Sequence, residues 1–96
     1  MGKNIVDELE ARIKAFGLRI TDTWQIKSFY GLSTYYTFEI KGKAYCISVC
    51  EYKKIGNKPS FVFSREDQMF LDYLYNGFNL NKCIKELEKE INKNYD

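Results

Sequence analysis

Two stretches of alternating apolar and polar residues flank the dipeptide Lys41-Gly42, and this pattern constrains the fold more than any other feature of the chain. Residues 35–40 and 44–52 both follow the period of two that is typical of β-strands. A two-residue turn at Lys41-Gly42 would pair Phe38 with Tyr45 and would bring the two alternations into one register. The sequence therefore predicts an antiparallel hairpin whose apolar residues share a face.

The two faces of this hairpin differ in chemistry. The apolar face gathers Tyr36, Phe38, Ile40, Tyr45, Ile47 and Val49. The opposite face gathers Tyr35, Thr37, Glu39, Cys46, Ser48 and Cys50. Antiparallel sheets commonly pack one face on the core and leave the other uncovered. We expect helices to cover the apolar face, and we expect the other face to be exposed to solvent or to form a contact surface.

A helix and a further strand are predicted before the hairpin. Residues 4–16 carry apolar side chains at helical spacing, and Gly17 follows as a C-terminal stop. Residues 18–29 change to a period of two, which predicts a half-buried strand. The alternation places Trp24 on the core side together with Phe38, and Asp22 is an exception to it.

The pattern after the hairpin predicts a loop, a short strand and two helices. Lysine, glycine, asparagine and proline in residues 53–60 indicate a loop, and residues 61–63 can add a short fourth strand. Ser64 is expected to cap a helix that ends at Asn76-Gly77. The residues expected to point inward from that helix are Met69, Phe70, Tyr73 and Leu74. A last helix is expected from about Leu80 to Lys93, because its apolar residues form one stripe.

These elements define one domain that spans residues 1–96. A run of strands followed by helices favours the α+β class over a parallel α/β fold. The predicted order is α-β-β-β-(β)-α-α, with an antiparallel sheet of three or four strands packed on helices.

The composition argues against most enzyme mechanisms. The chain has no histidine, which removes the usual base beside a catalytic thiol and a common zinc ligand. Cys46 and Cys50 share a face but lie about 13 Å apart along a strand, too far for a disulfide. Of the acids within predicted strands, only Asp22 and Glu39 have a position that could serve acid–base chemistry. We therefore predict no catalytic residue, no cofactor and no metal, and we expect that the protein is not an enzyme.

The cellular setting can also be predicted from composition. No apolar run reaches the roughly 20 residues that a membrane-spanning helix needs, so no membrane partner is expected. An odd number of cysteines, three, suits free thiols in a reducing compartment. The expected location is the cytoplasm.

Aromatic residues make up 17% of the chain, and eight are tyrosine. Tyr30, Tyr35, Tyr52 and Tyr75 are not explained by the core pattern, so they lie at the rim of the core or at an interface, where tyrosine is enriched. The predicted partner-binding residues are Tyr35, Thr37, Glu39, Ser48, Tyr52, Lys53, Lys54 and Lys58. They favour a non-enzymatic module that binds a protein partner or itself. The alternative is a protein that binds single-stranded nucleic acid by the same face and the basic loop at 53–58.

Two short motifs carry a resemblance to a known family. The segment Gly42-Lys43-Ala44-Tyr45-Cys46-Ile47-Ser48, the segment Asn76-Gly77-Phe78-Asn79 and the predicted order of elements resemble small phage-encoded type II-A anti-CRISPR proteins. The resemblance implies an inhibitor or adaptor from a phage or mobile element that binds a host nuclease or another defence protein. It assigns a functional role to no individual residue.

Overall fold

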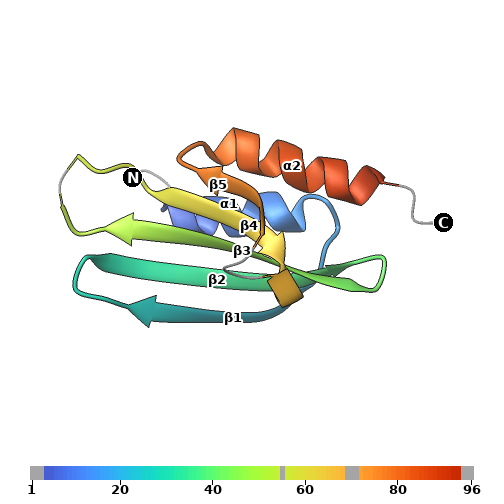
Figure 1. The fold of residues 1–96 in the computed structure, drawn as a ribbon, viewed down its shortest axis with the longest axis horizontal. Coiled ribbons are helices and arrows are strands. Elements are labelled where there is room, and N and C mark those ends of the chain that lie inside the picture. Colours follow the sequence, from blue (N-terminus) through green and yellow to red (C-terminus); the bar gives the residue numbers. More distant parts are fainter. Residues whose placement is uncertain (1–3, 55, 69–71, 94–96) are drawn as a thin grey trace.

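A computed structural model describes residues 4–54, 56–68 and 72–93 of the chain. Over these residues the chain forms two α-helices, one 3-10 helix and five strands, arranged around a single sheet (Figure 1). The elements are α1 (Ile5–Lys14), β1 (Ile20–Lys27), β2 (Gly31–Ile40), β3 (Lys43–Tyr52), β4 (Ser60–Arg65), η1 (Glu66–Gln68), β5 (Tyr73–Gly77) and α2 (Leu80–Asn92). The strands are antiparallel and lie in the order β1-β2-β3-β4-β5. The α+β class is confirmed, but the sheet has five strands rather than the three or four predicted.

The central hairpin has the register that the alternation predicts. Phe38 pairs with Tyr45 and Ile40 pairs with Lys43 across β2 and β3. Lys41 and Gly42 both have positive φ, 52° and 82°, as a tight two-residue hairpin turn requires. Gly42 adopts this conformation without steric cost, whereas Lys41 does not, so the turn and the two alternations together set the register.

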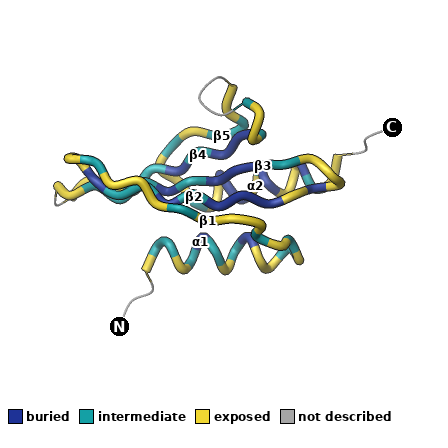
Figure 2. Tube along the Cα trace, turned by 90° about the horizontal axis from the view of Figure 1, so that it is seen from below, coloured by how far each residue is buried: buried dark blue, intermediate teal, exposed yellow. Residues whose placement is uncertain are grey.

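One face of the sheet packs against both described helices, and the core lies between them. The apolar hairpin residues are all buried, from Tyr36 at 3% exposed to Tyr45 at 0%. Leu9 and Ile13 of α1, and Leu87 of α2, join them in one apolar cluster. Figure 2 shows α1 lying along this face, while β4 and β5 rise away from α1 on the opposite side. Neither of the two described α-helices covers the second face of the sheet.

A buried carboxylate ties α2 to the sheet. Glu90 is 2% exposed, and its Oε1 accepts a hydrogen bond from the Tyr45 hydroxyl at 3.1 Å. Its Oε2 pairs with the Lys93 ammonium at 2.5 Å. Burial alone would raise the pKa of Glu90, but the hydrogen bonds from Lys93 and Tyr45 and the charges of Lys93 and Arg65 lower it overall. Glu90 therefore stays ionised, and the C-terminal end of α2 is held against β3.

The helix predicted from Ser64 to Asn76-Gly77 is wrong. Ser64 continues β4, where it pairs with Cys46 on one side and Tyr73 on the other. Tyr73 and Leu74 lie in β5, and Asn76-Gly77 ends that strand rather than a helix. Aromatic residues favour strands, and a short apolar run cannot distinguish strand from helix by its period. Met69 and Phe70, predicted to point inward, lie outside the described residues.

The predicted side of Trp24 is also wrong, because β1 contains a bulge. The register of β1 on β2 shifts between Ile20 and Asp22, so Ile20 still pairs with Phe38 but Trp24 pairs with Tyr35. One extra residue in a strand moves every later side chain to the opposite face. Trp24 therefore lies on the uncovered face, and Asp22, the exception in the alternation, lies at the bulge.

Candidate binding face

The uncovered face of the sheet, which we call the open face, combines aromatic and small polar residues. Its central row crosses the sheet from Trp24 through Tyr35, Ser48 and Val62 to Asn76. The Trp24 and Tyr35 rings stack with their centroids 5.1 Å apart and their planes 4° apart. Tyr35, Ser48 and Val62 belong to inner strands that are paired on both sides, so they can offer a partner only their side chains.

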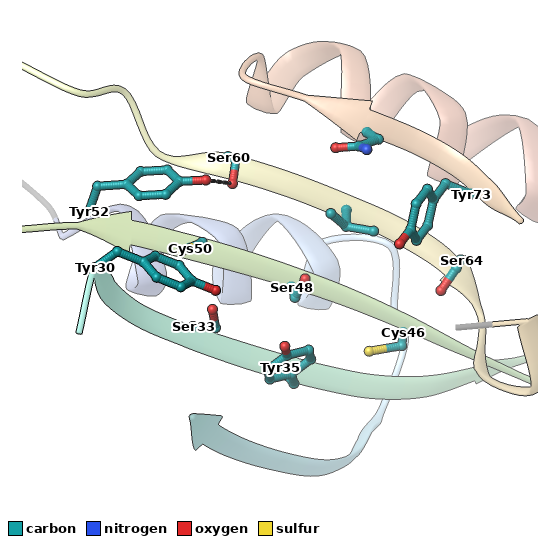
Figure 3. A pocket seen from close by; sticks show the side chains of 12 residues that line it. Tyr30, Ser33, Tyr35, Cys46, Ser48, Cys50, Tyr52, Ser60, Ser64 and Tyr73 are labelled. Carbon is teal, nitrogen blue, oxygen red and sulfur yellow. Dashed lines mark hydrogen bonds between the residues drawn. The ribbon is translucent and has the colours of Figure 1, made fainter. Parts of the chain in front are cut away.

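Small side chains in the middle of the open face leave a hollow of about 270 Å³ (Figure 3). We call this feature the tyrosine hollow. It is lined by Tyr30, Ser33, Tyr35, Cys46, Ser48, Cys50, Tyr52, Ser60, Val62, Ser64, Tyr73 and Asn76. Serine and cysteine from β2, β3 and β4 form the floor, and tyrosine rings stand around it (Figure 3). A rim of rigid rings over a floor of small residues produces a concave site on an otherwise regular sheet.

The described residues that line the tyrosine hollow include no charged side chain. Burial raises the pKa of the Tyr35 hydroxyl, and a hydrogen bond with Ser33 opposes that change only in part. Burial also raises the pKa of the Cys46 thiol to about 12. Both groups are therefore protonated and neutral at physiological pH. A charged group placed in this hollow would lose hydration without gaining an opposite charge, which disfavours it.

Several hydroxyl groups of the tyrosine hollow are available to a ligand. The Tyr52 hydroxyl and Ser60 Oγ share a hydrogen bond of 2.9 Å. Within the part of the chain that the structure describes, the hydroxyls of Tyr30, Ser48 and Tyr73 have no hydrogen-bond partner in the protein. A hydroxyl can both donate and accept, so this set suits a neutral group that offers donors and acceptors beside an apolar surface.

The structure separates the predicted partner-binding residues into three groups. Tyr35, Ser48 and Tyr52 line the tyrosine hollow, as the face assignment predicts. Thr37 lies on the same face, but it is 4% exposed, and its hydroxyl bonds to Thr21 Oγ1 at 3.0 Å. Thr37 is therefore unavailable to a partner, because the bulge in β1 covers it.

The charged members of the predicted set lie beyond the two ends of the tyrosine hollow. Glu39 is exposed and pairs with Ala44 near the β2–β3 turn. Lys53, Lys54 and Lys58 are exposed after the end of β3, at the opposite end of the strands. The structure does not bring Glu39 together with these lysines, so the predicted set does not form one patch.

Sequence reasoning missed the part of the hollow that β4 and β5 provide. Ser60 and Ser64 lie beside β3, and Tyr73 and Asn76 lie beside β4. The sequence predicts Ser60 in a loop, and it predicts Ser64, Tyr73 and Asn76 in a helix. The aromatic pair Tyr73 and Tyr75, spaced by two and followed by Asn76-Gly77, was the signal for a strand. Of the four tyrosines outside the core pattern, Tyr75 packs against the core instead.

The thiols and acids do not form a reactive centre in the described part of the chain. All three cysteines are free, and burial raises the pKa of Cys83, like that of Cys46, to about 12. A thiol with such a pKa is not a nucleophile at neutral pH. No cluster of three histidine, cysteine, aspartate or glutamate side chains able to hold a metal ion is found among the described residues. Neither described helix has the length and apolar character required to cross a membrane.

Comparison of the chain with protein-family models, with curated proteins and with solved structures finds no match. The resemblance to anti-CRISPR inhibitors therefore stays a prediction from the sequence. The chemistry of the open face is what bears on function.

Proposed function

We propose that this protein is a non-enzymatic binding module that recognises a protein partner through its open face. The observation that carries the proposal is the tyrosine hollow, a neutral concave site on the face that the helices leave uncovered. Tyrosine and serine dominate its lining, and these two residues are also enriched in antibody combining sites. Tyrosine supplies a large rigid contact area at low entropic cost, and serine supplies adaptable hydrogen bonds.

The size of the hollow supports an anchoring role within a larger interface. Pockets for cofactors and drug-sized ligands measure roughly 300–1,000 Å³. The tyrosine hollow, at about 270 Å³, lies just below that range. One protruding uncharged side chain of a partner would fit it, with the surrounding tyrosines and Trp24 as the contact rim. Binding hot spots take this form, a central pocket filled by an anchor and surrounded by residues that exclude water.

The partner that the anti-CRISPR resemblance implies is a host nuclease or another defence protein, in the cytoplasm. The identity of this partner is part of the proposal, as is the binding face. A small inhibitor needs no chemistry of its own, because it acts by occupying a surface that its target needs.

Ser48→Arg tests the proposal, because it places a cation at the centre of the hollow. The partner is captured from the cell that contains the protein, after nuclease treatment and chemical cross-linking, and its affinity is then measured with purified components. We expect binding to weaken at least tenfold, about 1.4 kcal/mol, with little change in thermal stability. The matched control is Ala11→Arg, which adds the same charge at an exposed position of α1. Equal binding by the two variants would remove the hollow from the interface.

Single-stranded nucleic acid is the second candidate, and one observation favours it. Lys58 lines a shallow depression with Tyr52 and Phe78, and Phe78 is 63% exposed. An aromatic surface beside lysine suits a stacked base and its phosphate.

Charge reversal of Lys53, Lys54 and Lys58 to glutamate distinguishes the two candidates. We expect partner binding to weaken by a few fold, with no loss of thermal stability, because these side chains are exposed at the edge of the site. The same variant is tested with a single-stranded oligonucleotide at several salt concentrations. Binding of the oligonucleotide by the wild-type protein, with a steep salt dependence that the variant loses, would support nucleic acid instead.

A further inference from the structure

Two neighbouring turns form one end of the sheet, opposite the turn between β2 and β3 (Figure 1). The first turn joins β1 to β2, and the second joins β3 to β4. They are held together, because Lys53 N donates a hydrogen bond to Tyr30 O at 3.0 Å. We call this end of the molecule the lysine tip. It comprises residues 26–29, 53–54 and 56–58.

Apolar side chains are exposed at the lysine tip. Phe29 is 90% exposed, which is the highest value among the large hydrophobic residues that the structure describes. Ile26, in β1 just before the turn, is 51% exposed. The turn that carries Phe29 is fixed, since Ser28 N donates a hydrogen bond to Gly31 O at 2.9 Å. Apolar groups displayed by a fixed turn indicate contact with another molecule or with a membrane.

The lysine tip is also basic. Its four lysines are exposed, and no acid lies among them in the sequence. They are Lys27, Lys53, Lys54 and Lys58. Glu51 is close to them in β3, but it is half-buried and pairs with Leu32. Asp7 and Glu8 belong to the first turn of α1, which lies along the core face rather than at the tip (Figure 2).

The opposite end of the sheet has mixed charge. Basic and acidic side chains alternate there around the turn between β2 and β3, around the bulge in β1 and at the end of β4. They are Arg19, Lys41, Lys43 and Arg65 together with Asp22, Glu39, Glu66 and Asp67. The two ends therefore differ, and only the lysine tip combines charge of one sign with protruding apolar groups.

We propose that the lysine tip binds the surface of a membrane that contains anionic lipids. Phe29 and Ile26 enter the boundary between the headgroups and the acyl chains, and the lysine ammonium groups remain at the level of the lipid phosphates. A fluid lipid surface accepts a protruding group without a matching pocket. It also accepts aliphatic Ile26, which has no ring on which a nucleic-acid base could stack.

Attachment to a membrane surface requires no spanning helix. The sequence predicts no membrane partner because no apolar run is long enough to cross a bilayer, and that reasoning concerns crossing alone. Stable attachment at the surface usually takes two signals, such as an apolar group and a basic patch. The lysine tip supplies both. The inference goes beyond the proposed function, because it concerns a different surface and a different partner.

Sedimentation with lipid vesicles tests the proposal on the intact chain. Vesicles of phosphatidylcholine are compared with vesicles of phosphatidylcholine and phosphatidylserine in equal parts. We expect the protein to bind the anionic vesicles at least about tenfold more strongly, since each lysine near an anionic surface adds about fivefold. Added salt should weaken this binding. Equal binding to both kinds of vesicle, or no binding to the anionic ones, would overturn the proposal.

Phe29→Ser tests the apolar contribution. We expect it to weaken binding to the anionic vesicles about tenfold, because a phenyl ring is lost from the apolar boundary. The matched control is Tyr73→Ser, because Tyr73 is also an exposed aromatic residue but lies toward the other end of the sheet, where it pairs with Ser64. Equal losses for the two variants would contradict a contact centred on the lysine tip.

Charge reversal tests the basic contribution. Changing the three lysines of the second turn to glutamate should abolish binding to the anionic vesicles. The matched control reverses three exposed lysines of the two helices, which changes the net charge by the same amount. These are Lys14, Lys85 and Lys89. If the control variant loses binding to the same extent, net charge rather than the lysine tip is responsible, and the proposal fails.

Tryptophan fluorescence reports insertion directly. The chain contains one tryptophan, so the double variant Trp24→Phe, Phe29→Trp moves the single indole ring to the lysine tip. We expect its emission to shift to shorter wavelength on anionic vesicles and to be quenched by brominated acyl chains. Bound protein without quenching would overturn the insertion. Binding to a single-stranded oligonucleotide but not to anionic vesicles would support nucleic acid instead, and the Ser48→Arg experiment would still test the proposed function separately.

Discussion

Phe63→Ala is expected to lower the free energy of unfolding by about 3–5 kcal/mol, the usual cost of removing a fully buried aromatic side chain. Phe63 is 0% exposed, and its ring stacks against Tyr45 at 5.7 Å and Phe38 at 6.4 Å between centroids. It lies in β4, where the sequence predicted only a short optional strand. For a domain of this size, the loss would be a large share of the total stability. Urea unfolding followed by circular dichroism measures it.

Val62→Ala is the matched control, because Val62 is the neighbour of Phe63 and points to the opposite face. It is half-buried and lines the tyrosine hollow. Its truncation should cost about 1 kcal/mol or less, since it removes little buried apolar area. Similar losses for Phe63→Ala and Val62→Ala would contradict the assignment of β4 as a strand with one core face and one open face.

The parts of the fold that sequence could predict are those with long, regular patterns. The β2–β3 register follows from two alternations and the turn at Lys41-Gly42, and α2 follows from an apolar stripe between Leu80 and Ile91. The segment from Ser64 to Gly77 could not be assigned in this way. It is short, its apolar residues fit a strand or a helix equally well, and pairing with β4 decides the outcome.

The open face could be predicted only where the local period holds. Tyr35 and Ser48 were assigned to it correctly, because the hairpin has no irregularity between them. Trp24 was assigned to the core, because a single bulged residue in β1 reverses the period and leaves little trace in the sequence. The stack of Trp24 on Tyr35 is thus a consequence of the bulge, and so is the aromatic rim at that side of the hollow.

Tyr73 and Asn76 reach the hollow for a reason that no local pattern contains. They belong to β5, which is an edge strand, and they become part of the site because β5 pairs with β4. Sites assembled from distant strands depend on strand order, and strand order is decided by packing over the whole chain. The sequence could therefore predict the centre of the open face, but not the side of the tyrosine hollow that β5 forms.

Gly31→Ala is expected to be the second strongly destabilising change, at about 3 kcal/mol. A Cβ at this position would collide with the carbonyl oxygen of Glu51 and would lie 3.1 Å from the Cα of Tyr52. Both are backbone atoms of the paired strand β3, so no side-chain rotation can relieve the collision. The start of β2 would have to move away from the end of β3, and the adjoining turn would move with it.

This change also tests how the site is supported, because the turn carries Tyr30, which lines the tyrosine hollow. Gly31 O accepts hydrogen bonds from both Ser28 N and Ser28 Oγ, which fix the turn. Gly31→Ala should therefore weaken binding of the partner, measured with purified components, under conditions where the variant is still folded. Gly17→Ala is the matched control, because Gly17 has a φ of +78° but no atom within 4 Å of an added Cβ. It should cost only the ~1 kcal/mol of a left-handed alanine and leave partner binding unchanged. Equal destabilisation by Gly31→Ala and Gly17→Ala would contradict the expected collision between a Cβ at residue 31 and the backbone of β3.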